Sequence, residues 1–279
     1  MDADRPGGVT DDRIFLRTAG RQIATRAGHP LRLRGVSLGG WMKMFGAPWP
    51  NTVYTAHDYA LPGFFDGGDY PGVSRGRYVD RAILEETFLA RTEYMRRTGT
   101  PIWIGEFGPV YTGDPRRDEM RYRVLGDQLE IYRRHDASWA LWTYKDIGLQ
   151  GLVYATGDSP YVRRIQGILE RKARLGVDAW GSSDEGVRHL LDPIEATFAR
   201  EFPSFDPFPF GQRSWIHSLV RHILLAEPLV EDFGGCFEGA TGEDIDALAD
   251  SFRFDRCAER PRLRDILRSA ASAPAPTAG

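Results

Sequence analysis

PIWIGEFGPV, residues 101–110 of this 279-residue chain, is an apolar run that contains one acid, Glu106, between Gly105 and Gly108. A short apolar run bounded by Gly and Pro is typical of a buried strand. An acid at the end of such a strand is a candidate for chemistry, because parallel α/β folds place reacting groups there. The alternative is a helix cap or an ion-pair partner. The rest of the sequence has to distinguish these two interpretations.

Strands and helices alternate on both sides of this run. Upstream, the sequence predicts a hairpin and a strand within 13–38, a strand at 53–59, a loop over 62–76 and a helix at 80–97. Downstream, it predicts a helix at 115–135, a strand at 137–148 and a helix at 160–175. The last helix has Ser159 as its cap, Pro160 in its first turn and Gly176 just past its end. This alternation predicts parallel βαβ units and an α/β fold.

Composition and charge exclude several classes of partner. The chain has 42% hydrophobic and 12% aromatic residues, and its net charge is −3. Because acids and bases are interspersed, we expect no nucleic acid and no membrane as a partner. Cys236 and Cys257 have no ligand cluster near them, so we expect no metal site and no disulfide framework. We also expect no cofactor. The N-terminal residues show no signal segment, which predicts a cytoplasmic protein, or a secreted one where a leader was removed.

Four segments of the predicted strands carry a recognisable pattern: LRLRGVSLGGWM, NTVYTAHDYALPGF, PIWIGEFGPV and WALWTYKDIGLQGLVY. Together they resemble glycoside hydrolase family 5, the cellulase-like retaining β-glycosidases. These segments are similar to barrel strands one, six, seven and eight of the family, in the family's order. The resemblance implies a (β/α)8 TIM barrel and hydrolysis of β-linked glycans in polysaccharide catabolism.

The resemblance also implies site residues. It makes Glu106 the nucleophile, places His57 and Tyr59 beside it on strand six, and makes Trp142 the aromatic floor under the sugar. The chemistry of these residue types agrees, since Tyr59 could donate to an ionised carboxylate and an indole stacks on a pyranose. The glycines beside Glu106 would let a sugar approach the backbone. Without the family context, His57 and Trp142 would each be interpreted as core residues.

Further acids and aromatic residues have weaker support. Asp58 and Asp146 are expected to be structural or to support their neighbours. Four aromatic residues either line a glycan cleft or pack within loops; they are Phe64, Phe65, Tyr70 and Tyr111.

One element of the family is missing. Its acid/base belongs to an Asn-Glu-Pro motif on strand four, and the single asparagine here, Asn51, precedes Thr52. Only the nine residues MKMFGAPWP separate Trp41 from Asn51, whereas one parallel crossover needs about a dozen or more. Strands two to five of the barrel are therefore expected to be deleted. Asp146 and Glu86 are the conceivable substitutes for the missing acid.

These observations predict a domain organisation and two functions. We expect an incomplete (β/α)8 barrel at 13–175, a helical extension at 176–270 and a disordered tail at 271–279. The first function is retaining hydrolysis of β-linked glycans through Glu106, with low activity for want of the acid/base. The second is a non-catalytic carbohydrate-binding or assembly remnant. Open sheet edges would also allow a homodimer.

Overall fold

The computed structural model describes residues 16–25, 27–32, 34–36, 53–59, 69–74, 77–177, 184–205 and 211–273. Phe64, Phe65, the junction between Trp41 and Asn51, and the tail from 274 onward lie outside these ranges.

A four-stranded parallel sheet forms the centre of the fold. Its strands are β4 (Arg34–Val36), β5 (Tyr54–His57), β8 (Ile102–Phe107) and β9 (Ser138–Leu141), in the order β4-β9-β8-β5. All three pairings are parallel, as the alternation of strands and helices predicts. The first strand pairs with the last, so the order corresponds to barrel strands one, eight, seven and six. That order is what closure between strands one and eight would leave after loss of strands two to five.

Within the described residues the sheet is open, with β4 and β5 at its edges. The chain is therefore α/β, and the part that the structure describes does not close into a barrel.

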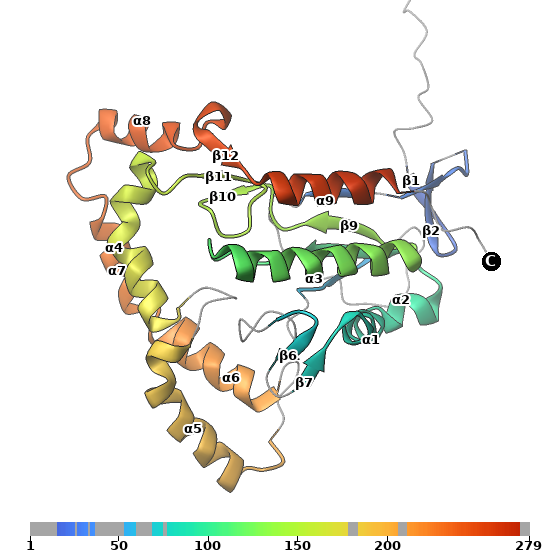
Figure 1. Cartoon of the computed structure of the whole chain (residues 1–279), viewed down its shortest axis with the longest axis horizontal. Helices are drawn as coiled ribbons and strands as arrows, with labels where there is room; N and C mark the ends of the chain where they lie inside the picture. The colour runs from blue at the N-terminus through green and yellow to red at the C-terminus, as the bar shows by residue number, and fades with distance from the viewer. Residues whose placement is uncertain are drawn as a thin grey trace, which may run out of the picture.

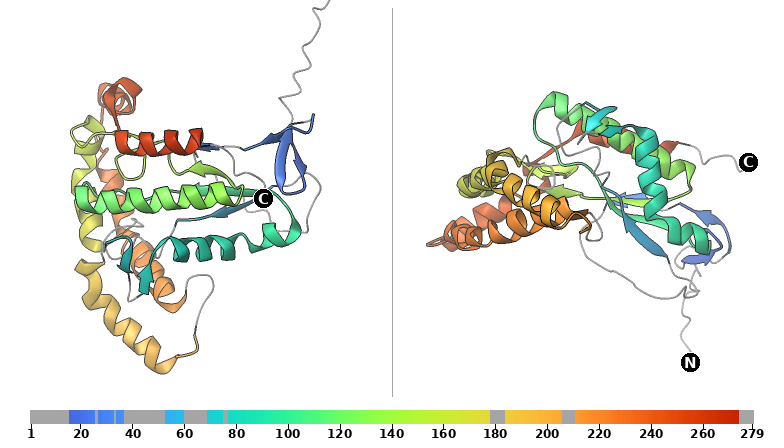
Figure 2. Two further views of the ribbon diagram at one scale, coloured as in Figure 1. Left: turned by 45° about the vertical axis from the view of Figure 1, so that its right-hand side comes forward. Right: turned by 90° about the horizontal axis from the view of Figure 1, so that it is seen from below.

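Four helices pack along the sheet: α1 (Arg81–Arg91), α2 (Glu93–Thr98), α3 (Pro115–Arg134) and α9 (Pro261–Ser272). Figure 1 shows α3 and α9 running side by side, and Figure 2 shows these helices gathered on one side of the strands. Asp80 caps α1, and Asp114 followed by Pro115 starts α3. The helix predicted at 80–97 is two helices, because the turn at Thr92 ends α1 and starts α2.

The core lies between the helices and one face of the sheet. Buried strand residues include Ile102, Ile104 and Phe107, and they pack in the same cluster as Phe88 of α1 and Leu263 of α9. Thr55, which alternates with Tyr54 and Ala56 along β5, is exposed. The helix-facing residues of β5 and β8 are thus apolar, whereas Thr55 on the other side of β5 is in contact with solvent.

Three small sheets accompany the central one in the part of the chain that the structure describes. The predicted N-terminal hairpin is present as β1 (Leu16–Ala19) and β2 (Gln22–Thr25), joined by β3 (Pro30–Leu31). The loop predicted over 62–76 contains part of a hairpin, β6 (Gly72–Ser74) and β7 (Arg77–Val79). The third sheet contains β10 (Lys145–Asp146), β11 (Val153–Ala155) and β12 (Cys257–Glu259).

Between β11 and β12, the described residues within 160–256 form a series of helices that we call the helical arm. Its elements are α4 (Pro160–Leu175), η2 (Glu185–Val187), α5 (Arg188–Glu201), α6 (Gly211–Leu219), η3 (Val220–Leu224), α7 (Pro228–Gly235), α8 (Gly242–Asp250) and η4 (Phe254–Arg256). Ser159 caps α4 and Gly176 ends it with a φ of 60°, as predicted. Because β12 pairs with β11, the chain re-enters the fold and α9 packs on α3. The division into domains at 175 and 270 stays a prediction.

No helix within the described ranges is long and apolar enough to cross a membrane.

Candidate active site

Glu106 owes its direction to an irregularity in β8. In a regular strand, residues two apart share a face, so Glu106 would point to the helices with Ile104. The pairing of β8 with β9 shifts register between Ile104 and Phe107, and Phe107 joins Ile104 in the core. Such a bulge re-aims the side chain beside it. Glu106 is thereby turned toward β5 on the face opposite the helices.

The two glycines beside Glu106 are required by the neighbouring strands. A Cβ at Gly105 would overlap Oγ1 of Thr55. Gly108 has a φ of 141°, and a Cβ there would lie 2.5 Å from the carbonyl oxygen of Trp142. The close approach of β5 and of the segment after β9 therefore explains why these positions are glycine. Access of a sugar to the backbone is not needed for this explanation.

Glu106 is in contact with both side chains that the family resemblance places beside it, Tyr59 and His57. The Tyr59 hydroxyl donates to Oε2 of Glu106 at 2.7 Å, and Nδ1 of His57 lies 3.3 Å from the same oxygen. Glu106 is only 5% exposed. Burial, followed by the hydrogen bond with Glu106, raises the pKa of Tyr59 well above its usual value. The hydroxyl thus stays protonated and donates to the carboxylate throughout the physiological range.

Trp142 lies at the same end of the sheet, one strand away. Its backbone N–H donates to the carbonyl of Phe107 at 2.8 Å, which fixes it beside the residue that follows Glu106. The peptide bond to Thr143 is cis. The side chain is half-buried. The structure thus brings the backbone of Trp142 to the site, and the stacking role of its ring stays a prediction.

The segment after β9 is hydrogen-bonded to the segment after β8. Oδ1 and Oδ2 of Asp146 accept from the backbone N–H groups of Gly148 and Gln150, at 2.8 and 2.6 Å. Nε2 of Gln150 donates to the carbonyl of Gly108 at 3.1 Å. Asp146 is therefore a loop-forming residue, as expected, and both its oxygens are engaged.

Other candidates from the sequence lie away from Glu106. Glu86 is on the exposed side of α1, in the helix layer. Tyr70 is buried and its hydroxyl donates to Asp127 of α3, while the guanidinium of Arg260 lies over the buried ring of Tyr111. The loop-packing interpretation of these two tyrosines is the one the contacts favour.

Sequence reasoning missed the side chains that fasten the end of β5. Arg91, Gln128 and Tyr132 reach it from α1 and α3. A signal was present, because Gln128 falls on the apolar stripe of the helix at 115–135, where a polar side chain needs a buried partner.

In the described part of the chain, no group of three or more His, Cys, Asp or Glu side chains could hold a metal ion.

Comparison with known proteins finds a family model, a curated relative and solved structures that are similar to this chain. Residues 37–148 match the model of the cellulase family, glycosyl hydrolase family 5. A curated protein, "Beta-xylosidase" of Phanerodontia chrysosporium, is 39% identical over 259 residues, which cover 88% of this chain and 54% of that protein. The chain thus spans about half the length of this relative.

One of the solved structures is entitled "Crystal Structure of a glycoside hydrolase". It has 19% identity and a TM-score of 0.31, and the match covers 36% of this chain and 32% of that one. A similarity this low does not bear on the fold.

The family match and the curated relative agree with the four strand segments quoted above. The chain is therefore related to the glycoside hydrolases of family 5, and residues 37–148 carry that family's sequence pattern.

Proposed function

We propose that this chain binds β-linked glycosides and forms a glycosyl-enzyme through the carboxylate of Glu106. The observation that carries the proposal is the contact of Glu106 with the protonated hydroxyl of Tyr59 and with His57. A nucleophile must be held in position for attack, and the hydrogen bond from Tyr59 fixes Oε2 of Glu106. The three residues also lie at the carboxyl ends of parallel strands, where barrel glycosidases perform their chemistry.

In the first step, an oxygen of Glu106 bonds to the anomeric carbon while the bond from that carbon to the leaving oxygen breaks. The electron pair departs with the leaving oxygen, which must be protonated unless it is a stable phenolate. In the second step, water attacks the anomeric carbon and releases the Glu106 carboxylate, and a base must accept the proton of that water.

The second carboxyl that would supply this acid and base has no counterpart in the sequence, which lacks the Asn-Glu motif. General acid–base help contributes about 10²- to 10⁴-fold, so we expect slow or absent turnover of ordinary glycosides. Activated aryl glycosides should still react at the first step.

The name of the curated relative makes β-xylosides the first substrate class to test. A stopped-flow experiment with dinitrophenyl β-xyloside should show a burst of phenolate that is stoichiometric with enzyme. Methyl β-xyloside should give no detectable product, and Glu106→Gln should abolish the burst. An equal rate on both substrates would contradict the absence of an acid.

The non-catalytic alternative rests on the same missing motif. Under that alternative, xylo-oligosaccharides would bind in calorimetry while the aryl xyloside released no phenolate from a folded protein.

A further inference from the structure

Asp58 lies between the two residues that touch Glu106 and points the other way. Because side chains alternate along an extended segment, His57 and Tyr59 reach Glu106 while Asp58 faces the helices. Asp58 is 2% exposed. A buried carboxylate is costly unless it is paired and hydrogen-bonded. Its partners should therefore show what it does.

The carboxylate of Asp58 is bonded by one side chain from each covering helix. Nη1 of Arg91 on α1 donates to Oδ1 at 2.8 Å, and the hydroxyl of Tyr132 on α3 donates to Oδ2 at 2.9 Å. Burial, followed by the Asp58 charge, raises the pKa of Tyr132 well above its usual value, so this hydroxyl stays a donor. Both oxygens of Asp58 thus have partners fixed in the helix layer.

The same helices hold the backbone on either side of Asp58. Nη1 of Arg91 also donates to the carbonyl of His57 at 3.0 Å, and Nε2 of Gln128 donates to the carbonyl of Asp58 at 2.6 Å. The N–H of Asp58 donates to the carbonyl of Glu106 at 2.9 Å. The segment 57–59 is therefore fastened to the helices on one side and to β8 on the other.

We propose that Asp58 is a positioning residue, which holds His57 and Tyr59 in contact with Glu106 through its bonds to Arg91 and Tyr132. The consequence for catalysis rests on the proposed function of Glu106. The consequence for geometry does not, because it concerns only where His57 lies relative to Glu106.

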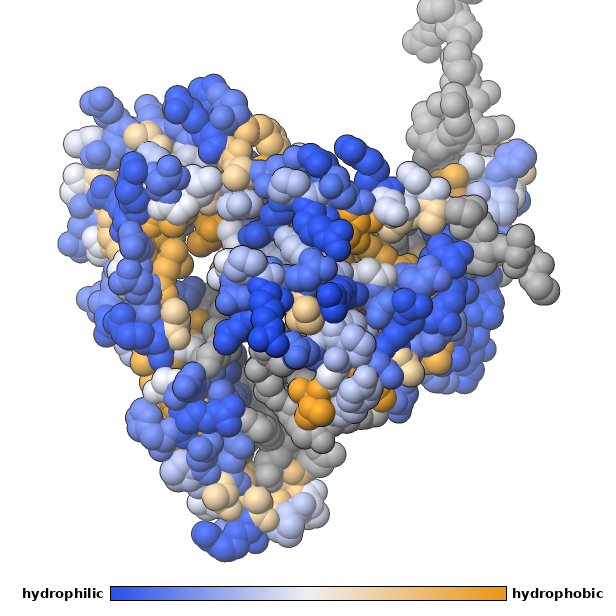
Figure 3. Space-filling view, in the orientation of Figure 1, coloured by the Kyte–Doolittle hydropathy of each residue, from blue (hydrophilic) through white to orange (hydrophobic). Residues whose placement is uncertain are grey.

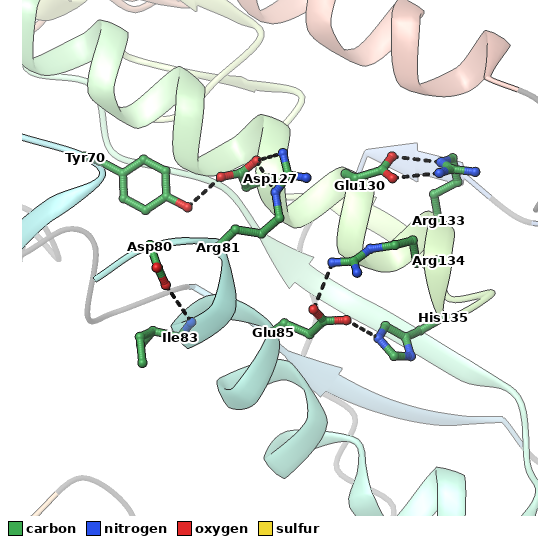
Figure 4. A network of polar contacts seen from close by, with 10 residues as sticks. All are labelled: Tyr70, Asp80, Arg81, Ile83, Glu85, Asp127, Glu130, Arg133, Arg134 and His135. Atoms are coloured by element: carbon green, nitrogen blue, oxygen red, sulfur yellow. Dashed lines mark hydrogen bonds and ion pairs between the residues drawn. The ribbon is translucent and has the colours of Figure 1, made fainter. Parts of the chain in front are cut away.

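A matched control exists in the same helix layer. Asp127 on α3 also accepts from one tyrosine and one arginine, with Tyr70 at 2.7 Å and Nε of Arg81 at 2.7 Å (Figure 4). It joins α3 to α1 and to the segment before β6, and none of these contacts involves residues 57–59. Asp127→Asn thus removes a similar charge from a similar cluster without releasing the site.

The first measurement does not depend on activity. In nitrogen NMR of the His57 ring, Glu106→Gln should shift the signals strongly in the wild-type background. The same substitution should have less than half that effect in an Asp58→Asn background and its full effect in Asp127→Asn. An undiminished effect in Asp58→Asn would overturn the proposal.

The second measurement is the burst of phenolate from dinitrophenyl β-xyloside. Asp58→Asn should slow it about 10- to 100-fold, the cost of a displacement of about 1 Å, with a smaller change in KM. Asp127→Asn should leave the rate unchanged. An equal loss in both variants would mean that Asp58 contributes only to general stability.

A failure of the proposed function can be distinguished from a failure of the positioning role of Asp58. If the wild-type protein gives no burst, the proposed function fails while the NMR comparison still decides the role of Asp58. If Asp58→Asn does not fold, Tyr132→Phe keeps the ring and removes one donor to Asp58. It should then reduce the Glu106-dependent shift of His57 in part, and an unchanged shift would overturn the proposal.

Discussion

At the scale of residues, the site depends on three side chains, and contacts outside the site fix the direction of each. Glu106 is turned toward β5 by the bulge in β8, and His57 and Tyr59 meet it because Asp58, between them, is bonded to the helices. The contact of Tyr59 with Glu106 is the shortest of the bonds that Glu106 makes with these residues, at 2.7 Å. Its loss should therefore be measurable.

We expect Tyr59→Phe to slow the phenolate burst about 10- to 100-fold, because a hydrogen bond to a charged group contributes about 1.5 to 3 kcal/mol. Tyr70→Phe is the control, since Tyr70 also donates to a carboxylate at 2.7 Å, that of Asp127. A rate equal to that of the wild type in Tyr59→Phe would show that this hydroxyl does not support the nucleophile.

At the scale of elements, local signals predicted helix ends well. Ser159, Pro160 and Gly176 bound α4 as expected, because capping involves only residues near in sequence. The bulge in β8 was not predictable, because it depends on how two neighbouring strands pair. The packing of α9 on α3 was missed as well, since a long stretch of chain separates these two helices and only the fold brings them together.

Leu263 tests whether α9 belongs to the core. It is fully buried in the cluster that also contains Phe107 and Leu125. Leu263→Ala should lower the free energy of unfolding by about 2 to 5 kcal/mol, as buried leucines do. Leu224→Ala, at a position 68% exposed on the arm, should change it by less than about 0.5 kcal/mol. Equal losses in urea denaturation would contradict this packing.

Glu85 should make the contact between α1 and α3 sensitive to acid. It accepts from Nε2 of His135 at 2.6 Å and from Nη2 of Arg134 at 2.9 Å (Figure 4). The hydrogen bond from His135, with help from Arg134, lowers the pKa of Glu85. Because the folded-state pKa lies below the unfolded one, the stabilisation is full above about pH 4.3 and is lost as the pH falls through the folded value.

Glu85→Gln should therefore destabilise the protein at neutral pH, and the difference from the wild type should shrink on acidification below pH 4. Urea denaturation at several pH values measures this difference. A difference that is constant with pH would mean that the charge of Glu85 contributes nothing.

At the scale of the whole molecule, the central strands that the structure describes form an open parallel sheet. Hydrophilic residues cover most of the face of the molecule shown in Figure 3, with hydrophobic patches between them. The order β4-β9-β8-β5 could be anticipated from the family resemblance, and the helices after 176 were expected as a helical extension. The return of the chain through β12 to pair with β11 was not expected, because no local signal in the sequence indicates it. Unpaired strand edges promote association with other chains.

We expect concentration-dependent self-association through the edge strand β5. Thr55 is exposed on this strand, and Thr55→Lys should weaken the association, because a lysine on an edge strand opposes pairing. Light scattering over a range of concentrations measures it. A monomer at all concentrations in the wild-type protein would show that β5 does not serve as an interface.

The most direct test of Glu106 as the nucleophile is to locate the trapped sugar. After brief reaction with a fluorinated, activated β-xyloside and acid quenching, tandem mass spectrometry of the digested protein should place one glycosyl group on Glu106. Tyr59 and Asp146 should remain unmodified. A sugar attached to another residue, or a folded protein that binds xylosides and acquires no sugar, would contradict the proposed role of Glu106.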